Sequence, residues 1–315
     1  MSPSLVSRIW PKSVYRSNRE ETRVVGENQP GSLVAFGGKL AASLFSVLFP
    51  SDCRICGVPL SNVSRLPVCP ECLNAIHPIE GTVCITCGER IFSPYAVDGA
   101  TGPRCGLCRR VEPIFSRAVA YGSYQSGLRE LIHLLKFGGV RSAASVLGYM
   151  LGEAISRLEP EFPAGDMALI PVPLHRSKLR QRGFNQAELT ARAALNARER
   201  GDRLRLCTGV LIRKRETASQ IGLTSHQRRE NLRGAFAVAQ PKVVLGREVL
   251  LVDDVYTTGA TVSECARVLR RAGATKVWVA TIARTLKISA QEMAISPGGA
   301  DEAIGALSLT PAAGG

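Results

Sequence analysis

The sequence predicts an α/β protein in which a parallel β-sheet flanked by helices follows a small cysteine-rich module. From about residue 115 onward, short apolar runs alternate with segments of helical periodicity, as in sheets built from strand–helix–strand units. The run Val249–Val252 is apolar at consecutive positions, as expected for a strand that helices cover on both faces. Eight of the ten cysteines form four C-x-x-C pairs between residues 53 and 108.

The composition indicates the compartment and the kind of partner. The chain has 315 residues, with 40 basic against 26 acidic side chains and a net charge of +14. Such a charge balance suits a phosphate-rich partner, either a small molecule or a nucleic acid. Clustered C-x-x-C pairs without a convincing secretory signal indicate reduced thiolates, so we expect a cytoplasmic protein.

We expect four segments along the chain. Residues 1–31 are polar and without pattern, which predicts a disordered extension, and 287–315 form a flexible tail rich in Ala, Gly, Ser and Pro. Residues 32–112 hold a leading helix and the cysteine module, and 113–286 form the sheet domain. The apolar stretch 33–49 is interrupted by Gly37-Gly38-Lys39, so we interpret it as an amphipathic packing helix and expect no membrane span.

The cysteine pairs predict metal binding. Each C-x-x-C brings two sulfur atoms to one side of a tight turn, and two such turns complete a tetrahedral Cys₄ zinc site. Eight thiolates therefore predict two structural Zn²⁺ ions in a double zinc ribbon. Neighbouring pairs are the simpler partners, but the spacing also allows a cross-braced arrangement. The predicted ligands are Cys53, Cys56, Cys69, Cys72, Cys84, Cys87, Cys105 and Cys108.

Two other uses of these cysteines are less favoured. Redox C-x-x-C chemistry would need a thioredoxin-like strand context, which none of the four copies has, and disulfides would need an oxidising compartment. Cys265 stands apart on the apolar face of a predicted helix, so we expect it to pack in the core.

The elements of the sheet domain follow from hydrophobic periodicity. Strands are predicted at 118–124, 168–172, 210–213, 235–238, 248–252 and 276–283, and helices at 127–137, 142–158 and 184–200. A further helix is expected from Thr261 to a stop at Gly273, since Thr261 and Glu264 have the spacing of a capping box.

Two adjacent carboxylates, Asp253 and Asp254, end the strand at 248–252, and a loop of small, hydroxyl and glycine residues follows. Such a loop directs backbone N–H groups and a helix dipole at one point, which suits a phosphate. In open α/β sheets, ligands bind at the carboxyl ends of the strands. Carboxylates beside an anion site fit a ligand that also carries hydroxyl groups or a bound Mg²⁺.

This combination resembles the phosphoribosyl pyrophosphate (PRPP) loop of type I phosphoribosyltransferases. The resemblance implies that the acidic pair holds the ribose hydroxyls, that the following loop binds the 5′-phosphate, and that the sheet is type I phosphoribosyltransferase-like. A strand–turn–helix with two surface acids is the plain alternative. The implied PRPP-binding residues are Asp253, Asp254, Thr257, Thr258, Gly259, Ala260 and Thr261.

A strongly basic segment, predicted as the loop Pro173–Gly183, follows the strand at 168–172. A leaving pyrophosphate needs charge neutralisation, which cationic donors provide. In the type I transferases the loop after the first core strand is the pyrophosphate loop. The resemblance implies this role for Arg176, Lys178, Arg180 and Arg182, with a solvated basic loop as the alternative.

A long polar loop, Arg213–Gly234, precedes the strand that carries the acidic pair. The same family has a mobile flap over the active site at this place, and the length and charge of the loop fit a closing lid. A surface hairpin is the alternative. The candidate lid residues are Gln220, Arg228, Arg229 and Asn231.

Four features together resemble the ComF (competence protein F) family. They are the cysteine pairs, the Pro-Val-Pro-Leu…Arg-Gly-Phe-Asn-Gln segment, the Gln…Arg-Arg-x-Asn loop and the Asp-Asp-Val-Tyr-Thr-Thr-Gly-Ala-Thr loop. The resemblance covers about residues 40–286. That family is associated with DNA uptake in natural transformation and carries a phosphoribosyltransferase-type domain.

Two classes of function follow from the resemblance. In the first, the protein is a Mg²⁺-dependent glycosyltransferase that takes the phosphoribosyl group from PRPP and releases pyrophosphate, although the residues identify no general base. In the second, it binds single-stranded DNA and acts with DNA-uptake proteins, and the phosphoribosyltransferase-like domain serves as a ligand site or sensor. Aromatic residues make up 5% of the chain, so contacts to DNA would go mainly to phosphate.

Overall fold

The computed structural model describes residues 52–60, 65–92, 97–98, 102–198, 203–217 and 224–286. The expected disordered extension, leading helix and C-terminal tail, together with Gln220, lie outside these residues. Within the described part of the chain, every helix is too short or too polar to cross a membrane.

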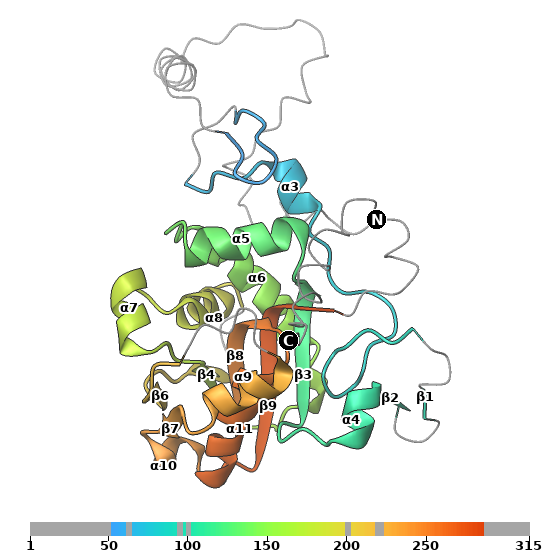
Figure 1. The fold of residues 1–315 in the computed structure, drawn as a ribbon, viewed down its shortest axis with the longest axis vertical. Helices are drawn as coiled ribbons and strands as arrows, with labels where there is room; N and C mark the ends of the chain where they lie inside the picture. The colour runs from blue at the N-terminus through green and yellow to red at the C-terminus, as the bar shows by residue number, and fades with distance from the viewer. Residues whose placement is uncertain are drawn as a thin grey trace, which may run out of the picture.

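A five-stranded sheet forms the centre of the molecule, with the strand order β3-β9-β8-β4-β5 (Figure 1). Every pair of neighbouring strands is parallel, which confirms the predicted α/β class. β8 lies between β9 and β4, so the strand with the acidic pair occupies the middle of the sheet. The strands are β3 (Arg117–Ser123), β4 (Met167–Pro171), β5 (Leu204–Leu206), β8 (Glu248–Tyr256) and β9 (Lys276–Arg284).

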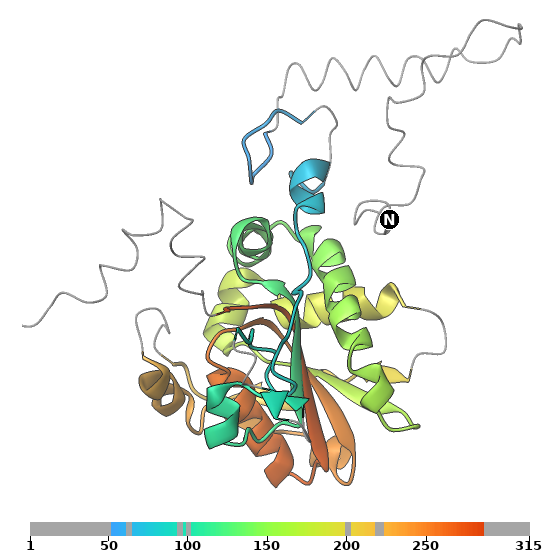
Figure 2. The ribbon, with the colours of Figure 1, turned by 90° about the vertical axis from the view of Figure 1, so that its right-hand side faces the viewer.

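Helices cover the two faces of the sheet (Figure 2). Successive residues of β8 pack on opposite faces. Leu250 and Val252 pack into one core with the helices α5, α6 and α8. Val249 and Leu251 pack into a second core with α11. This two-sided burial explains why β8 is apolar at consecutive positions. The helices of the first core are α5 (Ser126–Lys136), α6 (Ala143–Ser156) and α8 (Gln186–Asn196), and α11 is Ala260–Arg271.

Two predicted strands form a separate small sheet. β6 (Leu211–Arg213) and β7 (Phe236–Val238) pair with each other in antiparallel register and do not join the parallel sheet. The parallel sheet instead ends with β5, which the sequence pattern did not predict, because a three-residue strand is too short to show a periodicity. The remaining short helices near this edge are α7 (Arg176–Arg182), α9 (Ser225–Leu232) and α10 (Pro241–Val244).

The cysteine-rich segments dock on two different parts of the domain. In Figure 1 the first segment, with α3 (Pro70–Asn74), lies next to α5, and the second, with α4 (Gly106–Arg110), lies beside β3. Buried residues of the first segment join the core of α5, α6 and α8, and those of the second join the core of α11. A short hairpin, β1 (Val97–Asp98) and β2 (Gly102–Pro103), belongs to the second segment.

The structure corrects two expectations about the acidic motif. β8 continues to Tyr256, so Asp253 and Asp254 lie within the strand instead of after its end. The predicted capping box of Thr261 and Glu264 is wrong, because α11 begins at Ala260, directly after Gly259, and no side chain caps its N-terminus. Glu264 is engaged elsewhere: its carboxylate accepts hydrogen bonds from the backbone N–H of Gly234 and from Arg267.

Candidate functional site

The acidic pair lies beside a lysine at the end of the central strand. Lys136, the last residue of α5, places its Nζ 2.9 Å from Oδ2 of Asp254, and both side chains are 16% exposed. The Asp253 side chain is bonded to the neighbouring backbone: its Oδ1 accepts a hydrogen bond from the N–H of Asp254 at 2.9 Å. The two neighbouring carboxylates therefore have different partners.

The protonation of this trio follows from burial and charge. Burial raises the pKa of Asp253 to about 7, and the neighbouring Asp254 adds to the rise, while Lys136 and Arg213 oppose it. Burial alone would lower the pKa of Lys136, but Asp254 outweighs it and the pKa rises. Lys136 thus stays charged, whereas the surroundings of Asp253 disfavour its ionised form.

The loop after the acids leads into an open helix end. Gly259 adopts the left-handed conformation, with φ 76°, as the N-cap of α11. Because no side chain caps α11, the N–H groups of its first turn are available to an anion. The hydroxyl oxygen of Thr258 is also buried and has no hydrogen-bond partner among the described residues. Together these donors fit a phosphate group.

The basic segment after β4 is a helix, which corrects the expectation of a loop at 173–183. α7 begins after His175, whose Nδ1 accepts a hydrogen bond from the backbone N–H of Ser177, and it ends at Gly183 in the left-handed conformation. A seven-residue helix with no buried side chain carries no hydrophobic periodicity, so its pattern does not predict a helix.

The four candidate pyrophosphate residues all lie on α7. Burial lowers the pKa of Lys178, and the nearby Arg213 and Arg182 lower it further. The Ser177 hydroxyl donates to Glu216 at 2.6 Å, so α7 is joined to the segment that follows β6. This crowding of cations would be relieved by a bound anion. The candidates are Arg176, Lys178, Arg180 and Arg182.

The predicted lid loop is partly helical. Arg228, Arg229 and Asn231 lie on α9, which Thr224 and Gln227 begin with a complete capping box. Glu264 of α11 holds Gly234, just beyond this helix, through a hydrogen bond of 2.7 Å. α9 is therefore anchored to α11, the helix that begins within the loop at 257–261.

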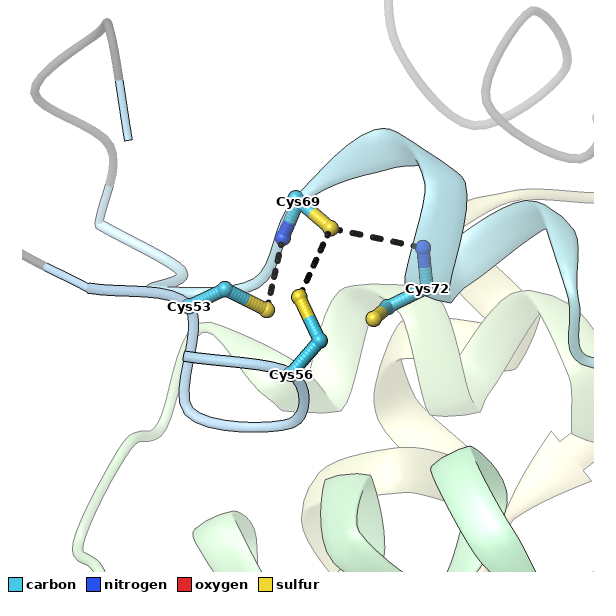
Figure 3. A group of neighbouring side chains, drawn as sticks. All are labelled: Cys53, Cys56, Cys69 and Cys72. Atoms are coloured by element: carbon cyan, nitrogen blue, oxygen red, sulfur yellow. Dashed lines mark hydrogen bonds between the residues drawn. The ribbon is translucent and has the colours of Figure 1, made fainter. Parts of the chain in front are cut away.

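The first cysteine cluster consists of Cys53, Cys56, Cys69 and Cys72 (Figure 3). Their four sulfur atoms lie within 4.8 Å of one another, and Cys56 and Cys69 are 3.7 Å apart at Sγ. In a tetrahedral Zn²⁺ site with Zn–S bonds of about 2.3 Å, adjacent sulfurs are about 3.8 Å apart. A disulfide needs about 2.05 Å. The cluster thus has the dimensions of a zinc site.

The second cluster has the same dimensions. Cys84, Cys87, Cys105 and Cys108 place their sulfur atoms within 4.8 Å of one another, and Sγ of Cys87 is 3.7 Å from that of Cys105. Neighbouring pairs thus supply each site, and the cross-braced arrangement is excluded for these residues. Cys265 is fully buried in the core of α11, as predicted.

The second cluster contacts the end of β9, next to the end of β8 that leads into the loop at 257–261. Arg284, at the end of β9, donates to the backbone carbonyl of Cys87 and to the carboxylate of Glu89, the latter at 2.9 Å. Its guanidinium also lies over the ring of Tyr256, 4.7 Å from the centroid. The first cluster reaches the domain elsewhere, where Ser142 donates to the carbonyl of Arg65 at 2.6 Å.

Sequence reasoning missed Lys136 and Arg284. Lys136 ends an amphipathic helix, where a lysine is ordinary, and only the fold brings it to Asp254. Arg284 left a weak signal: it follows an apolar strand without a break, and a cation in that position is either a strand end or a buried charge.

Comparison with known proteins agrees with this architecture. A double zinc ribbon domain model matches residues 44–109, and a phosphoribosyl transferase domain model matches residues 200–293. The chain is 33% identical to "DNA utilization protein YhgH" of Escherichia coli O6:H1 over 75% of this chain and 98% of the relative. It is 32% identical to "Competence protein F" of Haemophilus influenzae, over 69% of this chain and 96% of the relative.

The chain belongs to the ComF family. Within the same family, "Competence protein ComFC" of Bacillus subtilis is 26% identical over 65% of this chain and 79% of the relative. This ComF protein thus combines two cysteine sites that fit Zn²⁺ with a parallel sheet of the phosphoribosyltransferase type.

Proposed function

We propose that this ComF protein binds PRPP with Mg²⁺ at the end of β8 and transfers its phosphoribosyl group with release of pyrophosphate. One juxtaposition carries the proposal: two carboxylates near the end of β8 are followed, after a short loop, by an uncapped helix N-terminus with a buried hydroxyl that has no partner among the described residues. Carboxylates accept ribose hydroxyls, and first-turn N–H groups bind a phosphate.

In this proposal, residues of β8 and α7 have separate roles in binding the ribose and the pyrophosphate. Asp253 and Asp254 orient the ribose, and the cations of α7 stabilise the negative charge that develops on the leaving pyrophosphate. Mg²⁺, bound with the ligand, adds neutralisation at the same phosphates. Lys136 holds the side chain of Asp254 in place through their contact of 2.9 Å.

Calorimetric titration with PRPP tests binding. We expect saturable, Mg²⁺-dependent binding to the wild type, and a loss of about 10- to 100-fold for each of Asp253→Asn and Asp254→Asn, since a hydrogen bond to a charged group contributes about 1.5–3 kcal/mol. Asp166→Asn is the matched control, because Asp166 is an exposed carboxylate paired with Arg205. No binding to the wild type at millimolar PRPP would contradict the proposal. Pyrophosphate release on addition of a nucleobase or amine acceptor reports the transfer step.

Single-stranded DNA binding is the second candidate function, and a specific surface favours it. Phe137, directly after Lys136, is 69% exposed, and the guanidinium of Arg182 lies 5.2 Å from its ring centroid. Arg141 lies over the ring of Phe184, 5.2 Å from its centroid, so the segments 137–141 and 182–184 each supply one aromatic ring and one arginine. Phe184 is partly buried against the core, so Phe137 is the ring that is open to a base, and an exposed ring among cations is an element of a base-stacking platform. The names of the relatives, DNA utilization and competence proteins, agree with such a role.

Fluorescence anisotropy with a labelled oligothymidylate tests this surface. Base stacking contributes about 1–3 kcal/mol, so Phe137→Ala should weaken binding at least about 5-fold without changing its salt dependence. Arg180→Gln should instead lower the salt slope by about 1. Phe92→Ala is the control, since Phe92 is also exposed and lies beside an arginine, Arg90. Equal losses for Phe92→Ala and Phe137→Ala would count against a specific platform.

A further inference from the structure

The second cysteine cluster is joined to the phosphate loop by a chain of buried contacts. Arg284 is 3% exposed and donates to two acceptors of the ribbon, the Cys87 carbonyl and the Glu89 carboxylate. The ribbon turn is also bonded to the sheet, because the backbone N–H of Ala118 donates to the carbonyl of Thr86 at 2.7 Å. The turn that carries two of the sulfur ligands is therefore fixed to the ends of β3 and β9.

The chain of contacts continues through one aromatic ring. Tyr256 is 8% exposed, with the guanidinium of Arg284 over its ring and the edge of Phe115 at a centroid distance of 6.3 Å. The ring lies against the backbone of Gly259, where an added Cβ would come within 2.6 Å of Cζ of Tyr256. The N-cap of α11 is therefore shaped by the position of this ring.

The orientation of Arg284 depends on the folded ribbon. A buried guanidinium without a carboxylate partner is costly, and Glu89, five residues after Cys84, is the partner that the structure provides. Structural zinc sites supply folding free energy to small ribbons that have little hydrophobic core. Loss of Zn²⁺ from the second cluster would therefore release Glu89 and the Cys87 carbonyl from Arg284.

We propose that the second cysteine cluster positions the phosphate loop, and that Arg284 is the positioning residue that links them through Tyr256 and Gly259. The first cluster makes no such link in the described residues, since its buried side chains pack with α5, α6 and α8. The consequence for PRPP affinity rests on the proposed function, whereas the coupling of ribbon and loop does not.

Hydrogen exchange of the full-length, zinc-loaded protein tests the coupling. We compare Cys105→Ser in the second cluster with Cys56→Ser in the first, with zinc content measured in parallel. The readout is the exchange, by mass spectrometry, of the backbone amides of 257–266, which include the Ser263 N–H bonded to the carbonyl of Gly259. Cys105→Ser should raise exchange in this loop at least tenfold, and Cys56→Ser should change it less than twofold. Equal exchange in both variants, or no change in Cys105→Ser after its zinc is lost, would overturn the proposal.

Substitutions of the linking residues separate positioning from general stability. Arg284→Met should loosen the loop as Cys105→Ser does while zinc stays bound. Glu89→Gln keeps an acceptor but removes the charge, so it should raise exchange in the loop by an intermediate amount. It takes the place of Arg284→Met if that variant does not fold. Arg284→Lys should restore part of the protection. If the loop keeps wild-type exchange in both Arg284→Met and Glu89→Gln, Arg284 is not the link.

PRPP titration of the same variants adds the functional readout. Where wild type binds PRPP, Cys105→Ser and Arg284→Met should weaken binding at least tenfold and Cys56→Ser less than twofold. Where wild type does not bind, the proposed function fails, and loop exchange alone still decides the coupling.

Discussion

Asp253 and Asp254 are neighbours in sequence, yet their surroundings make them chemically unequal. Asp254 has a lysine within 2.9 Å, whereas burial and the charge of Asp254 disfavour ionisation of Asp253. Successive strand residues point to opposite faces, so one carboxylate meets the end of α5 while the other lies on the side of α11. A ligand that brings positive charge or hydroxyl donors would favour the ionised form of Asp253.

The pH dependence of stability should show this inequality. Between 3.8, the ordinary pKa of an aspartate, and about 7, folded Asp253 keeps a proton that the unfolded chain has released. The folded state then binds more protons, so the free energy of unfolding falls as pH rises through this window. Asp253→Asn lacks this titration. Measured by urea denaturation between pH 5 and 8, the stability of the wild type relative to Asp253→Asn should therefore decrease with pH and level off above about 7.

A rising or flat difference over the same range would show that Asp253 is ionised in the folded protein. Asp166→Asn controls for the substitution itself, because the Asp166 side chain is 64% exposed and its contact is with Arg205.

At the scale of elements, the pair Lys136–Asp254 joins helix α5 to the central strand. Removal of one member of a largely buried pair leaves an uncompensated charge, which costs about 3–5 kcal/mol. Because both side chains keep 16% exposure, we expect Lys136→Met to cost about 3 kcal/mol, the lower end of that range. Lys136→Met with Asp254→Asn should recover most of the loss. Guanidinium denaturation of the four species of this double-mutant cycle gives the coupling energy.

The matched control is Lys276→Met. Lys276 also pairs with a carboxylate of β8, Glu248, at 3.0 Å, but its side chain is 52% exposed. Exposed pairs contribute less than about 1 kcal/mol, so this variant should be nearly neutral. Equal costs for Lys136→Met and Lys276→Met would mean that the α5 pair is solvated.

The elements that the sequence predicted well are those with a buried face. α5, α6 and the apolar strands of the sheet lie within a few residues of the predicted ranges because their periodicity records what they pack against. The helices α7 and α9 were not predicted, because neither has a hydrophobic stripe and a polar side chain caps the N-terminus of each. The N-terminus of α11 was misplaced by one residue because capping-box spacing is common, and here Glu264 is used by Gly234 and Arg267.

The same distinction applies to the site. The loop at 257–261 and the eight cysteines are local patterns, so their residues could be found from sequence. Lys136 and Arg284 could not, because each acts on a partner more than 100 residues away and no local spacing reports such a contact. Sequence motifs thus identify the candidate ligand-binding groups, and the fold shows which groups hold them in place.

At the scale of the molecule, two cores lie on either side of the sheet, and each includes one cysteine cluster. The two metal sites are therefore set into the packing of the domain and do not form a separate lobe. The first cluster supports the layer of α5, α6 and α8, and the second supports the layer of α11. Each ribbon has little core of its own and depends on the domain for its packing, as expected for small zinc modules.

The contact between Arg284 and the second ribbon also constrains the order of events during biosynthesis. The residues it joins are 195 and 197 positions apart, so the ribbon leaves the ribosome long before its anchor has been made. At about 5–20 residues per second, the nascent ribbon waits at least about 10 seconds for β9. Contacts of such sequence separation form late in folding. The bond of Thr86 to Ala118 of β3 can form early, whereas anchoring of the second ribbon by Arg284 is one of the last steps of maturation. The first ribbon, whose partners α5 and α6 follow closely in the chain, docks before that anchor forms.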